Sequence, residues 1–541
     1  MSTVEESPPY LAPEVTNVAD TEKDRVSTEK VQPAKAAFDN MSDAEKAEIH
    51  ELKLKHANRN DADEALKIFE EGEVITMTPE DEKKLLRKID LHLMPLLCLV
   101  YGLNYLDKTT LSYASIMGLK TDINLTGGDY SWVGSMFYFG YLVWEWPTSA
   151  LLQRLPLAKW SAFNVIMWGL VLCCLAGVKS FATAMTVRFF LGVFEAAVSP
   201  GFALFTSQWY TVREQGLRTG FWFSFNGWGQ ILGGAVAYGI ATGLEKHPVA
   251  IKSWQLLFLV IGLFTSAIGV LFLFVMPDNQ LNAKFLTKKE RLMAVERIRV
   301  NQQGVGNKHF KAYQFWEALS DPMVWAFVFY SLVADIPNGG ITNFFSQLIV
   351  SFGYTPKQSL LLGIPGGAVE VIALVLAGWL GDRYRNRLLI CTSGLLIAML
   401  GMLLIVCLDH SHDVGRLIGY YLTQSSPTPF VALLSLISTN VAGWTKKTTV
   451  AAMYLIGYCV GNIVGPQVFR AKDAPDYRNA QIVILVCWGL SLLDILFIYW
   501  WCRKENARKA AIRSAPGYAK MEGQEFFDLT DRENPEFIYS L

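Results

Sequence analysis

Charged residues are scarce in this sequence: they make up 18% of it, against 52% hydrophobic residues. A soluble globular protein carries about 25% charged residues, so this chain has too little polar surface for an aqueous protein of its length. Its 48 basic and 49 acidic residues nearly cancel, and no basic domain stands out. This balance excludes the positively charged surface of a nucleic-acid-binding protein. The apolar composition indicates a lipid bilayer as the partner instead.

Residues for metal binding and catalysis are also few, with eight cysteines and seven histidines in 541 residues. The cysteines lie in or beside apolar runs, without metal-ligand spacing and without neighbouring histidines, which indicates buried apolar side chains. The sequence contains no nucleophile–base arrangement and no phosphate-binding glycine loop, so we expect no enzymatic activity, no cofactor and no metal. Residues 1–90 lack the short apolar core of a signal peptide, and the first spanning helix is expected to direct insertion.

The sequence contains long apolar runs, each about as long as the 20 residues that a helix needs to cross a bilayer. They predict an all-α membrane protein with 12 transmembrane helices in two six-helix halves. The first six helices are expected near residues 94–115, 131–151, 160–179, 182–207, 219–243 and 254–276. The second six are expected near residues 323–345, 359–380, 388–408, 416–439, 448–469 and 481–501.

The domain organisation follows from these helices and from the polar segments around them. We predict an N-terminal tail (1–85) that is largely disordered because it is rich in Glu, Lys, Ala, Pro and Ser. The two six-helix bundles (86–276 and 323–501) are joined by a charged central loop (277–322), and a polar tail (502–541) follows.

Lysine and arginine are concentrated in the tails and in the loops on the same side of the predicted bundle. The positive-inside rule places that side, with both termini, in the cytosol. The sequon Asn124-Leu125-Thr126 then lies outside, so close to the membrane that it is a weak glycosylation acceptor.

The loop after the eighth predicted helix, residues 378–387, reads Gly-Trp-Leu-Gly-Asp-Arg-Tyr-Arg-Asn-Arg. It resembles the loop signature G-x-x-x-D-R-x-x-x-R of the major facilitator superfamily. Asp382, Arg383 and Arg387 would act in gating, as a latch between a carboxylate, a guanidinium and a helix end. A basic loop that only obeys the positive-inside rule is the alternative. The matching loop after the second helix lacks the aspartate.

Other strings resemble the anion:cation symporter family, with the fungal allantoate permease branch closest. They include Asn-Tyr-Leu-Asp-Lys at 104–108, Arg-Phe-Phe-Leu-Gly-Val-Phe-Glu at 188–195, Asn-Gly-Gly at 338–340, Gly-Asn-Ile-Val-Gly-Pro at 461–466 and Asp-Leu-Thr-Asp at 528–531. The resemblance implies the major facilitator fold, whose halves rock about a site near the bilayer midplane. It also implies proton- or sodium-coupled import of a small carboxylate such as allantoate, ureidosuccinate, nicotinate or pantothenate.

Ionisable side chains at membrane depth cost about 2.5–3.5 kcal/mol each even on lenient scales and are therefore candidates for function. Seven positions qualify: Asp107, Lys108, Glu145, Arg188, Glu195, Glu370 and Asp494. The helical rise places Asp107 about 20 Å from the cytosolic end and Arg188 about 9 Å from the outer end of a core about 30 Å thick. At that common level the two side chains are expected to pair, with Glu195 two turns below Arg188.

These charges suit the binding of one anion and one proton. Arg188 and Lys108 are expected to bind a carboxylate, and Asp107 and Glu195 are expected to carry the proton. A permanent ion-pair network that only joins two helices is the alternative. Glu145 is either a gate or part of a helix-end ion pair, Glu370 is a possible cavity residue, and Asp494 is expected to be structural.

Polar side chains from both halves are further candidates for substrate contacts: Tyr105, Tyr141, Asn338, Asn343, Gln424, Ser425 and Asn462. Interhelical hydrogen bonding is the alternative for each Ser and Asn. Gly339-Gly340 and the Ser-Ser-Pro at 425–427 are expected to interrupt their helices, as cavity-lining segments do.

We therefore expect a secondary active transporter that takes up a small organic anion with protons, in the plasma membrane. An exporter of a small acidic metabolite or drug is one alternative. A nutrient receptor that binds without transporting is the other.

Overall fold

A computed structural model of the chain describes residues 78–302, 311–384, 386–409, 411–515 and 529–541. Most of the predicted N-terminal tail, residues 1–77, lies outside the described residues. The described segments are helical and contain no β-strand. Nine of the described helical segments are long and apolar enough to cross a membrane. The other three predicted spans, near 131–151, 219–243 and 416–439, are helical as well, but they are more polar or divided into shorter pieces.

The first half of the structure follows the predicted order closely. It contains α4 (Pro79–Ala114) with its continuations η1 (Ser115–Leu119) and α5 (Lys120–Asp122), then α6 (Asp129–Arg154), α7 (Leu157–Leu175), α8 (Phe181–Glu195), α9 (Val198–Trp209), α10 (Val212–Phe223), α11 (Phe225–Lys246) and α12 (Ser253–Val275). Helix α4 begins well before the predicted residue 94, because Thr78 caps it and Pro79 suits a first helical position.

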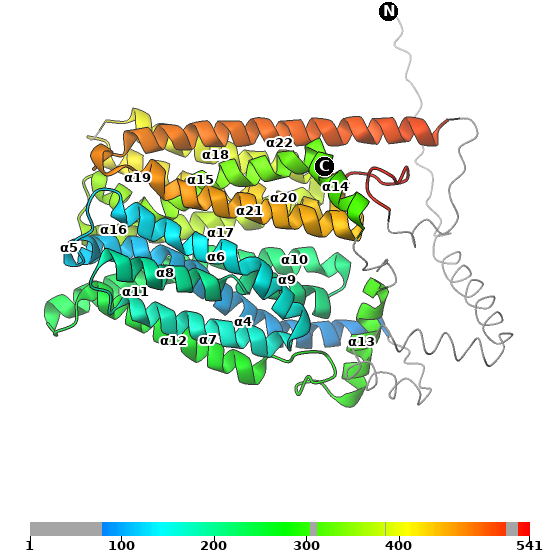
Figure 1. Cartoon of the computed structure of the whole chain (residues 1–541), viewed down its shortest axis with the longest axis horizontal. Helices are drawn as coiled ribbons and strands as arrows, with labels where there is room; N and C mark the ends of the chain where they lie inside the picture. Colours follow the sequence, from blue (N-terminus) through cyan, green and yellow to red (C-terminus); the bar gives the residue numbers. More distant parts are fainter. Residues whose placement is uncertain (1–77, 303–310, 385, 410, 516–528) are drawn as a thin grey trace, which may run out of the picture. The chain divides into compact units, whose positions relative to one another are not determined.

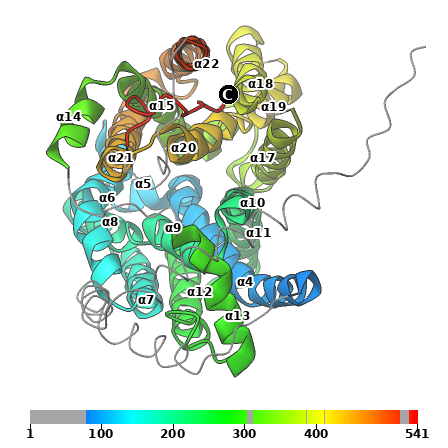
Figure 2. The ribbon, with the colours of Figure 1, turned by 90° about the vertical axis from the view of Figure 1, so that its right-hand side faces the viewer.

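The second half follows two short connecting helices, α13 (Lys288–Gln302) and α14 (Ala312–Ser320). It contains α15 (Pro322–Ser351), α16 (Pro356–Leu362), α17 (Ile364–Tyr384), α18 (Arg387–Cys407), α19 (Asp413–Thr423), α20 (Thr428–Asn440), α21 (Trp444–Val468), η2 (Ala471–Asp473) and α22 (Arg478–Arg513). Figure 2 shows the halves side by side, with α15 and α17–α22 in one group and α4 and α6–α13 in the other.

Four predicted helices are divided, and proline accounts for three of the divisions. Pro200 would clash with the carbonyl four residues earlier, and α8 and α9 are separated at that point. Pro365 follows the break between α16 and α17, and Pro427 lies in the break between α19 and α20. The expected interruption at residues 425–427 is therefore confirmed.

The expected interruption at Gly339-Gly340 is wrong, because α15 runs through it without a break. These glycines allow close helix packing instead. A Cβ atom on Gly339 would lie 2.8 Å from the Cα of Asn462, and one on Gly340 would lie 2.6 Å from the ring of Phe469. The missing side chains let α21 lie directly against α15.

The two halves are joined toward one end of the bundle. We call the end where α13, α14 and residues 529–541 lie the terminal end, and the other the opposite end (Figure 1). Near the opposite end, Ser135 donates a hydrogen bond to the carbonyl of Ile463 at 2.7 Å. The Tyr130 hydroxyl donates to the carbonyl of Asn343 at 2.7 Å. These contacts hold α6 of the first half against α15 and α21 of the second.

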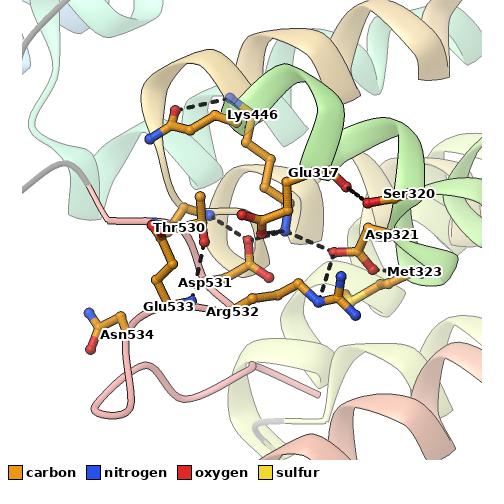
Figure 3. A network of polar contacts seen from close by, with 12 residues as sticks. Glu317, Ser320, Asp321, Met323, Lys446, Thr530, Asp531, Arg532, Glu533 and Asn534 are labelled. Atoms are coloured by element: carbon orange, nitrogen blue, oxygen red, sulfur yellow. Dashed lines mark hydrogen bonds and ion pairs between the residues drawn. The ribbon is translucent and has the colours of Figure 1, made fainter. Parts of the chain in front are cut away.

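The last residues of the chain pack against the terminal end of the second half (Figure 3). Lys446 is 1% exposed, and its ammonium group lies 2.9 Å from Glu317, 2.8 Å from Asp321 and 2.8 Å from Asp531. These carboxylates come from α14, from the residue that caps α15, and from the C-terminal segment. One buried cation thus joins three parts of the chain to α21.

Further hydrogen bonds fix the C-terminal segment, residues 529–541. The backbone N–H of Arg387 donates to the carbonyl of Leu541 at 2.7 Å, and the backbone N–H of Ser540 donates to the side-chain oxygen of Asn440 at 2.7 Å. Burial, together with the Asp531 carboxylate, raises the pKa of Tyr539 well above its usual range. Its phenol therefore stays protonated and donates to Asp531 at 2.8 Å.

Lys446→Met should be strongly destabilising, because it leaves buried carboxylates without their cation. Removing one partner of a buried ion pair costs about 3–5 kcal/mol, and we expect a loss of that size in the free energy of unfolding of the purified protein. The control is Lys159→Met, because Lys159 is 68% exposed and lies 3.7 Å from Asp278. Exposed pairs contribute about 0–1 kcal/mol. Equal losses in the two variants would contradict this role of Lys446.

Candidate functional site

Arg188 lies on α8 in the interior of the first half and is 2% exposed. Its Nε–H donates to the carbonyl of Val133 at 3.3 Å, while Nη1 has no hydrogen-bond partner. Its guanidinium carbon lies 5.1 Å from the centre of the Phe137 ring. A buried guanidinium with an unused N–H group is poised to bind a further acceptor.

Lys108 lies on α4 and forms an ion pair with Glu195 of α8. Its Nζ lies 3.2 Å from Oε1 of Glu195, with the Lys108 side chain 15% exposed and Glu195 fully buried. It also donates to the Asn104 side chain at 3.1 Å. Like Arg188, it lies over the Phe137 ring, 5.8 Å from its centre. The two cations therefore share one aromatic ring.

Asp107 is fully buried, and it accepts a hydrogen bond from the indole N–H of Trp168 at 2.8 Å. Its other oxygen, Oδ1, has no hydrogen-bond partner. The expected Asp107–Arg188 ion pair is wrong for this structure: within the described part of the chain the close pair is Lys108–Glu195. Asp107 still lies within electrostatic range of Arg188 and Glu195. Two acids and two bases thus form one buried group with balanced charge.

Close packing of α6 on α8 creates this arrangement. A Cβ atom on Gly192 would lie 1.9 Å from the carbonyl oxygen of Phe137, and one on Gly140 would lie 2.0 Å from that of Phe189. Only glycine fits at these two positions. Phe137 was not among the predicted site residues. The contact of its ring with two cations could have been suspected only from the aromatic string around Gly140.

Gly192→Ala should therefore separate α6 from α8 and displace Phe137. Overpacking costs about 1–3 kcal/mol, and here backbone atoms must move, so we expect a lower melting temperature and a severe loss of uptake. Gly239→Ala on α11 is the matched control, because a Cβ there meets no atom within 4 Å. Normal uptake by Gly192→Ala would show that this close approach does not position the site.

Asp335 on α15 is a buried acid of the second half that the sequence prediction missed. Its Oδ1 accepts hydrogen bonds from Asn338 at 3.3 Å and from Asn462 at 3.2 Å, and Asn338 also donates to Asn462 at 3.1 Å. The structure thus brings the predicted residues Asn338 and Asn462 together. The signal was an aspartate two residues before Pro337 in an apolar helix.

Glu370 on α17 is buried, and its Oε2 has no hydrogen-bond partner. Tyr105 of α4 and Tyr420 of α19 lie within its electrostatic range. Gln230 of α11 donates to the Tyr420 hydroxyl at 3.0 Å. This second polar group lies where the two halves meet and contains two predicted residues, Glu370 and Tyr105.

Tyr141 and Glu145 lie further along α6 toward the terminal end. The Tyr141 ring is buried, with its centre 6.4 Å from that of Tyr458 on α21. Oε1 of Glu145 has no hydrogen-bond partner. Asp494, expected to be structural, lies on α22 with Oδ2 unpartnered.

Three other predicted contact residues are engaged within their own half. Asn343 donates to the carbonyl of Gly339 at 2.7 Å, and Ser425 donates to that of Gly394 at 2.7 Å. Gln424 donates to the Thr423 hydroxyl at 3.3 Å. Ser425 therefore makes an interhelical hydrogen bond, which is the alternative to a substrate contact for this residue.

The predicted gating residues lie at the terminal end of α17 and α18. Arg383 is exposed, and Arg387 donates to the Ser435 hydroxyl at 3.0 Å. The side chain of Asp382 lies outside the described residues. The sequon residue Asn124 is exposed, with a φ of 54°, in the turn between α5 and α6.

Membrane-spanning helices in two halves, with buried opposite charges inside them, are typical of membrane transporters. Residues 97–466 match the family model of the Major Facilitator Superfamily, and the chain belongs to this family. The predicted fold class is thereby confirmed.

Similar proteins are found among the transporters of fungi. The chain is 43% identical to an uncharacterized transporter of Schizosaccharomyces pombe, covering 86% of this chain and 90% of the relative. It is 40% identical to the allantoate permease of Saccharomyces cerevisiae, covering 88% of this chain and 90% of the relative. A thiamine pathway transporter of the same yeast is 36% identical, over 84% of this chain and 86% of the relative. The predicted resemblance to the allantoate permease branch is confirmed.

Solved structures share the fold. A D-xylose-proton symporter superposes with a TM-score of 0.56 at 14% identity, covering 76% of this chain and 97% of the other. A bacterial homologue of the lysosomal transporter Spinster gives a TM-score of 0.55 at 15% identity, covering 75% of this chain and 95% of the other.

Proposed function

We propose that this transporter imports a small organic anion together with protons by alternating access, in which its two halves rock and open the buried charged group of the first half to one side of the membrane and then to the other. The observation that carries the proposal is the unpartnered Nη1 of buried Arg188, beside the Lys108–Glu195 ion pair. A guanidinium and an ammonium group over one aromatic ring suit a carboxylate. An anion would supply the acceptor that Arg188 lacks.

The coupling to protons follows from the acids in the same group. Protonation of Glu195 would release Lys108, and protonation of Asp107 would withdraw one negative charge from beside Arg188. Either event leaves a net positive site that attracts an anion. Loading then restores neutrality, which lowers the cost of moving the occupied site across the low-dielectric interior.

The substrate class we propose is a small carboxylate of the allantoate type. The support is the allantoate permease, which is 40% identical over most of both chains. A metal or cofactor has no role in this scheme, because the cations that bind the anion are side chains.

We further propose that the terminal end is cytosolic and that the membrane is the plasma membrane. Most of the lysines and arginines outside the membrane-spanning helices lie at this end, as the positive-inside rule requires. In that orientation the hydrogen bonds between the halves lie on the outer side. The structure then corresponds to the carrier closed toward the outside.

Uptake of radiolabelled carboxylates by cells expressing the chain tests this function, with a panel of allantoate, ureidosuccinate, nicotinate and pantothenate. We expect accumulation of one of these acids, increased by an inward proton gradient and reduced by its collapse. Lower accumulation than in control cells would identify an exporter, and saturable binding without accumulation would identify a receptor. Both of these results would contradict the proposal.

A further inference from the structure

Asp335 is a buried acid to which the proposed uptake scheme gives no role. It is 3% exposed, and both donors to its side chain, Asn338 and Asn462, are neutral amides bonded to Oδ1. Oδ2 has no hydrogen-bond partner. A buried carboxylate without a cation is costly, so a cation from a neighbouring helix would stabilise the carboxylate form of Asp335, and Oδ2 is free to accept it.

Lys108 is placed to provide that cation. It belongs to the first half and pairs with Glu195. Its helix, α4, packs against α15, the helix of Asp335: the backbone N–H of Ser346 on α15 donates to the Ser112 hydroxyl on α4 at 3.1 Å. The Lys108 charge acts electrostatically on Asp335 and on Cys459 of α21. Its four-carbon stem is flexible, and its ammonium group is a compact point charge that can change partners. The Phe137 ring lies near Nζ and gives Lys108 a cation–π contact while it is paired with Glu195.

We propose that the Lys108 ammonium passes from Glu195 to Asp335 when Glu195 binds a proton. A proton from water converts the Glu195 carboxylate into a neutral acid, which no longer holds the ammonium. The released Lys108 then pairs with Asp335 in its carboxylate form, any proton on Asp335 passing to water, and the ion pair stabilises that form. The new ion pair joins α4 of the first half to α15 of the second. Loss of the proton reverses the exchange.

This exchange links proton binding to a contact between the two halves. It rests on the proposed function in one respect, which is the binding of a proton by Glu195. The protonated carrier gains a link between its halves that the unprotonated carrier lacks. The ionisable groups that face Glu195 are Lys108, Asp107, Arg188, Tyr101 and Tyr138. Those that face Asp335 are Lys108, Tyr138, Tyr330, Tyr454, Tyr458 and Cys459.

A double-mutant cycle on the purified full chain in detergent, without substrate, tests the exchange through melting temperatures. Glu195→Gln imitates the protonated acid, and Asp335→Asn keeps the acceptor oxygen for the two asparagines but removes the charge. Each single variant leaves Lys108 one carboxylate, so we expect small shifts. The double variant leaves it neither, and we expect a drop several degrees larger than the sum of the single shifts.

The control cycle combines Glu195→Gln with Asp494→Asn, a half-buried acid on α22, and should be additive. An additive Glu195–Asp335 cycle would overturn the exchange. If the double variant does not fold, adding Lys108→Met should restore folding by removing the unpaired cation, and failure to restore it would also overturn the proposal. Because the cycle needs no substrate, a non-additive result stands even if the uptake panel contradicts import.

Discussion

Arg188→Met is expected to abolish uptake of the transported carboxylate. The substitution removes the guanidinium whose Nη1 is free and leaves Asp107 and Glu195 with Lys108 as the cation of the buried group. Leaving a buried charge without its partner costs about 3–5 kcal/mol. If at least 3 kcal/mol is lost from anion binding, kcat/KM for uptake falls by about 100-fold or more. Radiolabelled uptake, normalised to the amount of protein at the cell surface, measures this loss.

Two further variants separate charge from geometry. Arg188→Lys keeps the positive charge but loses the planar fork, and we expect uptake between that of the wild type and Arg188→Met. Arg416→Met is the matched control, because Arg416 is a buried arginine 4.7 Å from the centre of the Phe352 ring on another part of the bundle. We expect it to retain uptake within a few-fold of the wild type once surface amounts are equal. Equal losses in Arg188→Met and Arg416→Met would show that the effect is structural.

Asp107→Asn is expected to separate anion movement from proton movement. Asparagine can still accept the hydrogen bond from Trp168, so the local packing is kept, but it cannot bind and release a proton. Substrate-dependent proton flux should fall to background, and the remaining uptake should no longer respond to the proton gradient. Simultaneous recording of labelled uptake and external pH measures both quantities.

The control for this variant is Asp494→Asn, which removes a carboxyl at membrane depth on α22 outside the charged group. Its uptake and proton flux should match those of the wild type. Asp107→Asn with both quantities unchanged would remove Asp107 from the coupling scheme. The network would then be better described as a fixed set of ion pairs between α4 and α8.

The sequence predicted the approximate positions of the membrane-spanning segments, because length and hydrophobicity decide which segments cross a bilayer. It also contained the cause of the divided helices, since Pro200, Pro365 and Pro427 stand at three of the breaks. It did not predict that Gly339-Gly340 would lie in an unbroken helix. A glycine pair is compatible both with a break and with close helix packing, and the choice depends on the neighbour, here Asn462 on α21.

Asp107, Arg188 and Glu195 are buried in the first half, as expected for charges at membrane depth, but the expected ion pair between Asp107 and Arg188 is not formed. Helical rise gives the depth of Asp107 and Arg188, yet the direction of each side chain around its helix decides which atoms meet. That direction depends on the packing of α6 against α8, in which Gly192 faces the backbone of Phe137. Asp335 was overlooked, although an acid within an apolar segment was the same signal that identified Glu370 and Asp494.

The most direct test of proton-coupled anion import uses proteoliposomes that contain the purified chain and a pH-sensitive dye inside. The carboxylate that cells accumulate in the uptake panel is added outside under an inward proton gradient. We predict that the interior becomes more acidic in step with uptake of the labelled anion, and that neither change occurs with Arg188→Met. Uptake of the anion at the same rate with no acidification of the interior would contradict the account.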